Sequence, residues 1–156
     1  LGLEYDDKGK IASKGKINKK LLEKLNELDF YDKFPPKSLG LEWVQAIIFP
    51  MIDSIEEDIP TILRTFIEHV AIQIGKIIFK NQFVLITGGG VFNSFLMERI
   101  AYYSERKVKI QPNELINYKE ALIFAFLGLL RVENQVNCLQ SVTGAKKDHS
   151  SGVIFN

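Results

Sequence analysis

Three consecutive glycines, Gly88, Gly89 and Gly90, follow an apolar run and come just before a segment that Asn93 can cap as a helix. Glycine has no Cβ, so its backbone can lie against a ligand. The N-terminus of the following helix offers unpaired N–H groups and the positive end of the helix dipole. The spacing GGGxxN matches neither GxGxxG nor GxxxxGK[ST]. The pattern therefore indicates a phosphate or nucleotide site, or a tight turn between a strand and a helix.

Glu120 is a second candidate, because it is a carboxylate at the start of a segment almost free of charge, EALIFAFLGLL. It could bind a sugar hydroxyl, a water or a metal-bound water. In the first turn of a helix, a carboxylate is also stabilised by the helix dipole without any functional role. Lys37 and Ser38, in the segment PPKSLG, could contact a phosphate or a sugar, or could belong to an ordinary surface loop.

The two histidines give weaker patterns. His69 lies beside the apolar positions of a helix, and no neighbouring residue has the spacing of a metal ligand, so we expect a structural or surface role and predict no metal ligand in the chain. His149 lies in a tail that we expect to be mobile, KKDHS. Without a convincing Ser–His–Asp or Cys–His arrangement, a hydrolytic nucleophile is not expected.

The elements that would position the glycines alternate between strand and helix. Residues 82–87 are β-branched and aromatic, as in a buried strand, and residues 107–111 alternate as a second strand. Helices are predicted over 94–103 and over 118–131, where the second is apolar enough to be covered on several sides. Two strands around one helix imply a parallel, right-handed crossover and an α/β fold.

The first half of the chain is predicted to be helical between turns. Residues 8–18 form turns or a short hairpin, and Asn18 caps a helix over 19–28. Residues 34–40 form a loop, and a short helix over 42–48 ends near Pro50. Pro60 belongs to the first turn of a helix that continues to about residue 80.

Composition excludes several classes of protein. The chain of 156 residues contains 20 Lys and Arg against 19 Asp and Glu and has no clustered basic excess, which disfavours a nucleic-acid partner. Its single cysteine fits a cytoplasmic location. Residues 121–130 form the longest apolar run, about half of a membrane span, and no signal peptide is expected. No Met opens the chain, so we expect it to be a piece of a longer protein.

Five blocks, taken in order, resemble the C-terminal part of the bacterial anhydro-N-acetylmuramic acid kinases, in the form found in Bacteroidetes-type bacteria. The blocks are YDDKGKIASKG, FPPKSLGLEW, VLITGGGVFNSFLMERI, KEALIFAFLGLL and SVTGAKKDHSSG. The resemblance implies the C-terminal lobe of a ribonuclease-H-like fold, shared by sugar kinases and actin-like ATPases, with a central sheet flanked by helices. Residues 1–40 would link from an N-terminal lobe, and residues 41–156 would form the C-terminal lobe.

The same resemblance implies an activity. ATP and Mg²⁺ would be used to phosphorylate 1,6-anhydro-N-acetylmuramic acid while water opens the anhydro ring, giving N-acetylmuramic acid 6-phosphate in peptidoglycan recycling. Gly88, Gly89, Gly90 and Asn93 would bind the nucleotide. Glu120 would be catalytic and bind the sugar near the attacked carbon, and the Lys37–Ser38 block would also bind substrate.

The resemblance has one large departure. The family's phosphate loop, Gly-Thr-Ser-x-Asp-Gly, and the Asp-Thr-Gly-Pro-x-Asn block that carries its general base are absent from this sequence. We therefore expect the chain alone to be inactive and to need the N-terminal lobe as its partner, with a homodimer possible and no membrane partner. The alternatives are a lobe of another sugar kinase of the superfamily and a non-catalytic interaction module.

Overall fold

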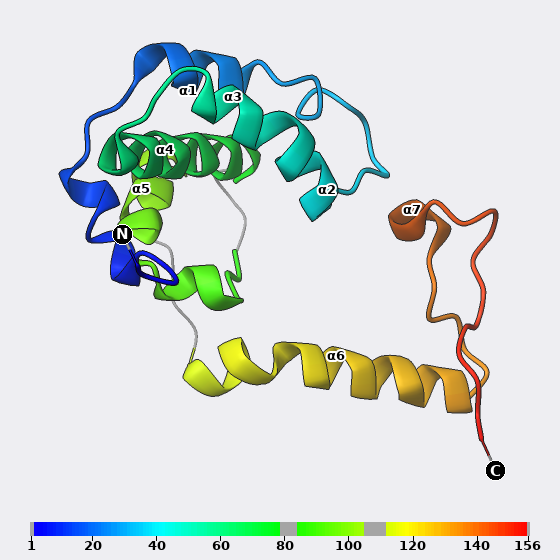
Figure 1. Cartoon of the computed structure of the whole chain (residues 1–156). Helices are drawn as coiled ribbons and strands as arrows, with labels where there is room; N and C mark the ends of the chain where they lie inside the picture. The colour runs from blue at the N-terminus through cyan, green and yellow to red at the C-terminus, as the bar shows by residue number, and fades with distance from the viewer. Residues whose placement is uncertain (1, 79–83, 105–111, 156) are drawn as a thin grey trace. The chain divides into compact units, whose positions relative to one another are not determined.

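The computed structural model describes residues 2–78, 84–104 and 112–155 (Figure 1). The chain divides into two compact units: unit 1 contains Leu1–Asp32 and Leu39–Gln111, and unit 2 contains Lys33–Ser38 and Pro112–Asn156. The helices of unit 1 are α1 (Lys19–Asn26), α2 (Leu41–Trp43), α3 (Phe49–Asp53), α4 (Ile59–Ile77) and α5 (Ser94–Ser104), and those of unit 2 are α6 (Asn113–Val132) and α7 (Gln140–Thr143). The predicted division at residue 40 concerns the lobes of a longer kinase and stays a prediction.

The predicted α/β fold with a central sheet is wrong for the part of the chain that the structure describes, which is helical and contains no sheet. Of the first predicted strand, residues 84–87 are described and form no strand. The second, 107–111, lies outside the described residues. Residues 82–87 have the composition of a strand, but composition is not sufficient, because a strand is stabilised by hydrogen bonds to a neighbouring strand. Two strands alone are marginal in water, and three or more are usually needed.

The interior of unit 1 is formed by α1, α3 and α4 and by the π-helical turn Val44–Ile48. Its fully or nearly buried apolar residues are Leu21, Leu25, Ile48 and Ile52. Asn18 caps α1 as predicted, since its Oδ1 accepts the N–H of Leu21 at 3.1 Å. Its own backbone N–H donates to Thr65 Oγ1 of α4 at 2.9 Å, which joins the start of α1 to α4. The two helices lie side by side (Figure 1).

The helix predicted to end near Pro50 continues through it, because the turn before the proline is wider than an α-helix. The N–H of Phe49 bonds to the carbonyl of Val44, five residues earlier, and α3 then runs to Asp53 with Pro50 in its first turn. Proline lacks an N–H and its ring crowds the carbonyl four residues before it in a regular helix. A π-helical turn relieves that crowding, so the chain can stay helical.

Helices α4 and α5 pack closely, and this contact positions the glycine turn. Pro60 lies in the first turn of α4 as predicted, and Asp58 caps the helix by accepting the N–H of Thr61 at 3.0 Å. A Cβ placed on Gly75 of α4 would lie 2.7 Å from Cβ of Tyr103 on α5. Since real Cβ contacts are not this short, only glycine lets the two helices approach at this point.

Unit 2 is built from a long helix and a tail that folds back on itself. The Nδ2 of Asn137 donates to the carbonyls of Leu127 and Ser151 at 3.1 and 3.0 Å, and its Oδ1 accepts the N–H of Ser151 at 2.7 Å. Cys138 and His149 form an antiparallel bridge in which each N–H donates to the other carbonyl at 3.1 Å. We call Asn137, Cys138, His149 and Ser151 the tail clasp. The tail that we expected to be mobile around His149 is therefore held by hydrogen bonds.

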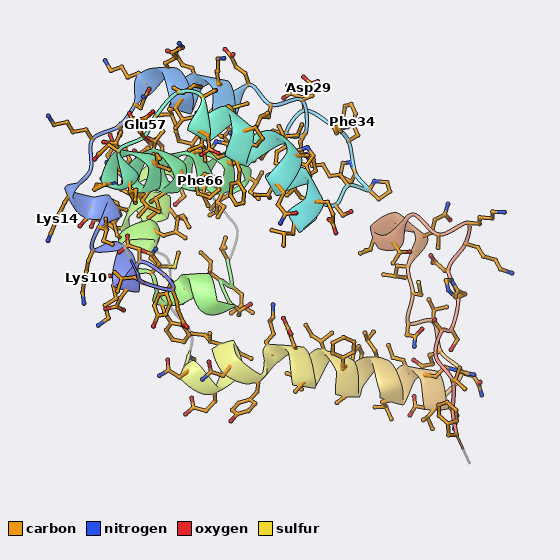
Figure 2. All side chains as sticks on the ribbon, in the orientation of Figure 1. Lys10, Lys14, Asp29, Phe34, Glu57 and Phe66 are labelled. Carbon is orange, nitrogen blue, oxygen red and sulfur yellow. The ribbon has the colours of Figure 1, made fainter. Side chains whose placement is uncertain are left out.

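Helix α6 begins earlier than predicted and is mostly exposed. It starts at Asn113, so Glu120 lies about two turns after the start, and the acidic residue in the first turn is Glu114. Apolar side chains of α6 such as Leu122 (62% exposed) and Phe124 (71%) are open to solvent, and side chains project from all sides of the ribbon (Figure 2). None of the helices in the described ranges has both the length and the apolar character needed to cross a membrane.

Candidate functional site

The glycine turn is a short 3₁₀ helix, Gly89–Phe92, between an extended segment and α5. Gly88 has φ +91° and ψ 166°, a conformation that is essentially restricted to glycine. The N–H groups of Val91 and Asn93 donate to the carbonyls of Gly88 and Gly90, both at 3.1 Å. Asn93 caps α5 as predicted, because its Oδ1 accepts the N–H of Leu96 at 3.0 Å.

The side of the glycine turn where side chains would project is open. A Cβ placed on Gly88 or Gly89 would meet no protein atom within 4 Å, and one placed on Gly90 would meet only Leu96 Cδ2, at 4.0 Å. Internal packing therefore does not explain the glycines at 89 and 90. Open space of this kind beside a bare backbone is what a ligand that contacts the turn requires.

A cavity of about 580 Å³ lies at this turn. Its apolar wall is formed by Leu63, Phe66 and Ile67 of α4 together with Phe92. The rest of the lining is polar or is backbone, and consists of Tyr5, Asp6, Asp7, Lys8, Gly89, Gly90 and Asn93. The size and the combination of an apolar wall with a few polar groups are typical of a small-molecule site.

The opening segment of the chain, residues 2–11, contributes to this site, and sequence reasoning missed it. Asp6 fixes its shape, since the two carboxylate oxygens accept the N–H groups of Ile11 and Ala12, both at 2.9 Å. Gly9 has φ +74°, and a Cβ there would lie 2.5 Å from Asn93 Oδ1 and 2.6 Å from Phe95 Cβ. The signal in the sequence was Gly9 itself, which we interpreted only as part of a turn.

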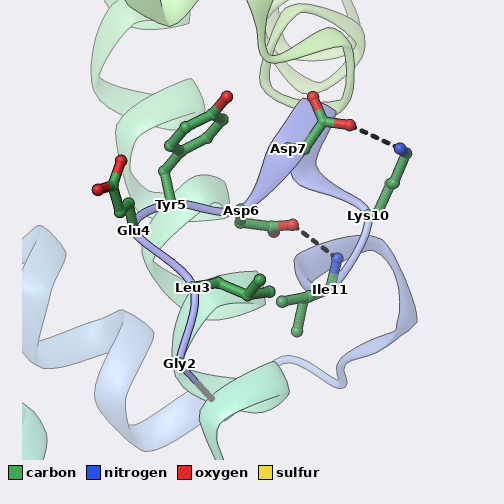
Figure 3. A pocket seen from close by; sticks show the side chains of 8 residues that line it. All are labelled: Gly2, Leu3, Glu4, Tyr5, Asp6, Asp7, Lys10 and Ile11. Atoms are coloured by element: carbon green, nitrogen blue, oxygen red, sulfur yellow. Dashed lines mark hydrogen bonds and ion pairs between the residues drawn. The ribbon is translucent and has the colours of Figure 1, made fainter.

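A second cavity, of about 450 Å³, lies on the opening segment itself (Figure 3). It shares Tyr5, Asp6 and Asp7 with the cavity at the glycine turn. In its lining, the exposed Asp7 and Lys10 form an ion pair at 2.6 Å, which lowers the pKa of Asp7 through the Lys10 hydrogen bond. Lys10 and Lys14 point away from the helices (Figure 2).

A buried charged cluster joins α4 to α5. Glu68 is 1% exposed and accepts two hydrogen bonds from Arg99, from Nε at 3.0 Å and from Nη2 at 2.7 Å. The hydroxyl of Tyr103 donates to the same carboxylate at 2.5 Å, and Arg64 Nη2 lies 3.2 Å from it. Burial alone would raise the pKa of Glu68, but the bonds from Arg99 and Tyr103 outweigh it, so the pKa lies below its ordinary value.

His69 is structural, as expected. It is 1% exposed, and its Nδ1 lies 2.8 Å from Asn26 Oδ1, which also accepts from Gln73 Nε2 at 2.7 Å. An amide oxygen can only accept, so the ring carries its proton on Nδ1, and Nε2 accepts from the Tyr31 hydroxyl at 2.8 Å. Burial, with a smaller effect from Lys76, lowers the pKa of His69 to about 4, so the ring is neutral near pH 7.

The predicted site residues fall into two groups. Gly89, Gly90 and Asn93 line the cavity at the glycine turn, and Gly88 lies directly beside them in unit 1. Glu120 is exposed on α6, and Lys37 and Ser38 are exposed in the loop of unit 2. The functional roles of all of these residues stay predictions.

The described residues contain no group of three His, Cys, Asp or Glu side chains that could hold a metal ion. A divalent cation at this site would therefore need ligands beyond these side chains, such as phosphate oxygens and water, which Mg²⁺ commonly uses.

The family model for "Anhydro-N-acetylmuramic acid kinase" matches residues 1–156. Anhydro-N-acetylmuramic acid kinase from Saccharophagus degradans is 33% identical, over 99% of this chain and 44% of its own length. The enzymes of the same name from Mannheimia succiniciproducens and Haemophilus influenzae are 34% and 31% identical, each over 99% of this chain and over 45% and 46% of their own length. The chain thus spans less than half the length of these relatives.

The match covers every residue of the chain, and the family that it defines is a family of kinases. The chain belongs to the anhydro-N-acetylmuramic acid kinase family.

Proposed function

We propose that this chain is the nucleotide- and sugar-contacting portion of an enzyme that phosphorylates 1,6-anhydro-N-acetylmuramic acid with ATP and water. In this reaction water adds to C1 of the sugar, and the bond from C1 to the bridging oxygen breaks. The bridging oxygen stays on C6 and receives the γ-phosphoryl group, so the products are ADP and N-acetylmuramic acid 6-phosphate. The enzyme would act in peptidoglycan recycling in the cytoplasm.

The observation that carries the nucleotide part of this proposal is the cavity at the glycine turn. Its apolar wall of Leu63, Phe66 and Ile67 suits the face of a base, and the bare backbone of Gly89 and Gly90 allows a close approach. Lys8 also lines the cavity, where it offsets part of the negative charge of Asp6 and Asp7. The residues present thus fit ATP, which supplies the phosphoryl group.

Glu120 is proposed to orient the attacking water at the sugar. Its exposed carboxylate on α6 can accept a hydrogen bond from that water and hold it in line with C1. Lys37 and Ser38 are proposed to contact the substrate from the loop of unit 2. Phosphoryl transfer depends mainly on positioning and electrostatic stabilisation. The phosphate loop and the general base would come from the N-terminal lobe, so the 156-residue chain alone is proposed to be inactive.

The first test measures ADP release by the full-length gene product with ATP and Mg²⁺. The acceptors are 1,6-anhydro-N-acetylmuramic acid, N-acetylmuramic acid and glucose, with the 156-residue chain alone as a parallel sample. Turnover with the anhydro sugar only is expected. Turnover with one of the other acceptors would support a different sugar kinase, and no turnover with any of them would support a non-catalytic interaction module.

The second test examines the glycine turn with a matched pair of substitutions. Gly89→Ala adds a methyl group that meets no protein atom within 4 Å, so the fold should be kept while the space for the nucleotide is reduced. We expect the affinity for ATP, measured by titration calorimetry on the full-length gene product, to fall by about tenfold. Gly128→Ala on α6 also meets no atom within 4 Å and should leave the affinity unchanged. Equal affinities in both variants would contradict a nucleotide at this turn.

A further inference from the structure

Glu68, Arg99 and Tyr103 form the most buried charged group in the part of unit 1 that the structure describes, yet none of them lines the cavity at the glycine turn. They cannot act by touching the ligand from their observed positions. The three α4 residues of the cavity wall, Leu63, Phe66 and Ile67, lie within about one and a half helical turns of Glu68. Arg99 and Tyr103 lie on α5, the helix that begins where the glycine turn ends.

We propose that the Glu68–Arg99 ion pair is a positioning pair for the nucleotide site: it fixes the orientation of α5 on α4 and thereby holds the glycine turn against the apolar wall. This inference rests on the proposed nucleotide function. It assigns a role in ligand affinity to two residues that touch no ligand.

The geometry of the Glu68–Arg99 ion pair is better suited to fixing the orientation of α5 than to stabilising the fold. Arg99 donates through Nε and Nη2 to the two oxygens of one carboxylate, a two-point contact that fixes direction as well as distance. A buried ion pair seldom stabilises a fold more than apolar side chains of the same volume would. What the ion pair adds beyond apolar packing is a fixed orientation of α5 relative to α4.

Arg64 completes the arrangement at the start of α5. Its guanidinium lies 4.8 Å from the ring centre of Phe95, in the first turn of that helix, while Nη2 contacts the Glu68 carboxylate at 3.2 Å. One carboxylate therefore joins an arginine on each helix, and Arg64 in turn contacts Phe95, three residues after the end of the glycine turn. Any shift of Glu68 reaches that turn through both arginines.

The close contact of Gly75 with Tyr103 makes the glycine turn sensitive to small changes of angle. Tyr103 lies near the C-terminal end of α5, and at 1.5 Å per residue the first residue of the helix, Ser94, is about 13 Å away. A rotation of about 5° around the Gly75 contact would move the glycine turn by roughly 1 Å. A displacement of 1 Å can cost about a hundredfold in rate when it misplaces a reacting group.

The experiment compares three variants of the full-length gene product. Glu68→Leu with Arg99→Met replaces the pair with apolar side chains, Arg99→Lys keeps the charge but removes the two-point contact, and Leu25→Ala weakens the core of unit 1 away from α5. For each we would measure the dissociation constant of Mg·ATP by calorimetry, KM and kcat for ATP, and the melting temperature.

We expect the double variant and Arg99→Lys to bind ATP about tenfold more weakly, with a larger change in KM than in kcat. Leu25→Ala should melt at a lower temperature and bind ATP as tightly as the unsubstituted protein. The inference is overturned if Arg99→Lys keeps the original affinity, or if affinity follows melting temperature in all three variants. If the double variant does not fold, Arg99→Lys and Leu25→Ala still decide between these outcomes. An unsubstituted protein that binds no ATP would instead overturn the proposed function itself.

Discussion

The two units reach a defined conformation by different means. In unit 1, the helices α1, α3 and α4 meet through buried leucine and isoleucine side chains, and α4 meets α5 through a buried ion pair. In unit 2, the long helix α6 keeps most of its apolar side chains exposed, and the tail is held by the side-chain and backbone hydrogen bonds of the tail clasp. Both α4 and α6 are apolar helices of similar length, 19 and 20 residues.

This comparison shows that apolar side chains stabilise the fold only where neighbouring elements cover them. A fully buried leucine contributes about 2 kcal/mol relative to an exposed one. The same residue on the exposed side of α6 contributes almost nothing to folding. Large exposed apolar areas also tend to mark surfaces that contact other protein.

The largest expected effect comes from the matched pair Leu25→Ala and Leu122→Ala. Leu25 is 0% exposed, so truncation should lower the free energy of unfolding by about 4 kcal/mol through lost burial and the cavity left behind. Leu122 is 62% exposed, and its truncation should cost less than about 1 kcal/mol. Urea unfolding of the full-length gene product would measure both. Equal losses would mean that this side of α6 is covered in solution.

Acid should destabilise unit 1 through His69. The folded protein holds the pKa of His69 at about 4 against an ordinary value of 6.5, so the unfolded chain binds the proton more tightly between these values. The stability contributed by the neutral ring is fully present above pH 6.5 and is lost as the pH falls towards 4, by about 3 kcal/mol in total.

His69→Gln tests this effect, because glutamine has no proton to bind in this range. Hydrogen exchange of α4 peptides in the full-length gene product, measured at several pH values, should show a steeper loss of protection in the unsubstituted protein than in the variant. The same slope in both proteins would exclude His69 as the titrating group.

Gly9→Ala and Gly128→Ala should change stability in opposite directions in the two units. Gly9 has φ +74° and its added Cβ would overlap Asn93 and Phe95, so we expect a loss of about 2 kcal/mol. Gly128 lies within α6 with open space around it, where alanine favours the helix by about 1 kcal/mol. Thermal unfolding would show both signs. Destabilisation by Gly128→Ala would mean that another surface approaches α6 closely there.

The smallest and most local effect is expected at the tail clasp. Asn137→Ala removes three partly exposed hydrogen bonds, which should cost about 1 kcal/mol. Hydrogen exchange should become faster at the Cys138 and His149 amides and stay unchanged in α4. Faster exchange in α4 as well would show that the two units unfold together.

Local features of the fold could be predicted from the sequence, and features that depend on distant partners could not. The caps at Asn18 and Asn93 and the place of Pro60 were correct, because each depends on a few neighbouring residues. The sheet was not, because a strand depends on the segment that pairs with it. The continuation of the helix through Pro50 was missed, since a wider turn just before a proline has no simple sequence signal.

The same distinction between local features and distant partners applies to the residues of the candidate site. The glycine turn was found because three adjacent glycines are visible in one short window. Tyr5 and Lys8 were missed because they are about 80 residues before the glycines in the sequence and reach the cavity only through folding of the chain. The Glu68–Arg99 pair spans 31 positions, and neither residue is distinguishable by type from the many charged residues on the surface.

The division of the chain into units has a consequence for its synthesis. Unit 2 combines residues 33–38 with residues 112–156, and Pro36 lies beside Gly144 of the tail. Residues 33–38 cannot make their contacts with the tail until residues 39–111 have been translated, which takes several seconds at about 5–20 residues per second. Unit 1 can form its leucine core during that time. Unit 1 can therefore fold first on the ribosome, and unit 2 can fold only after its last residues have emerged.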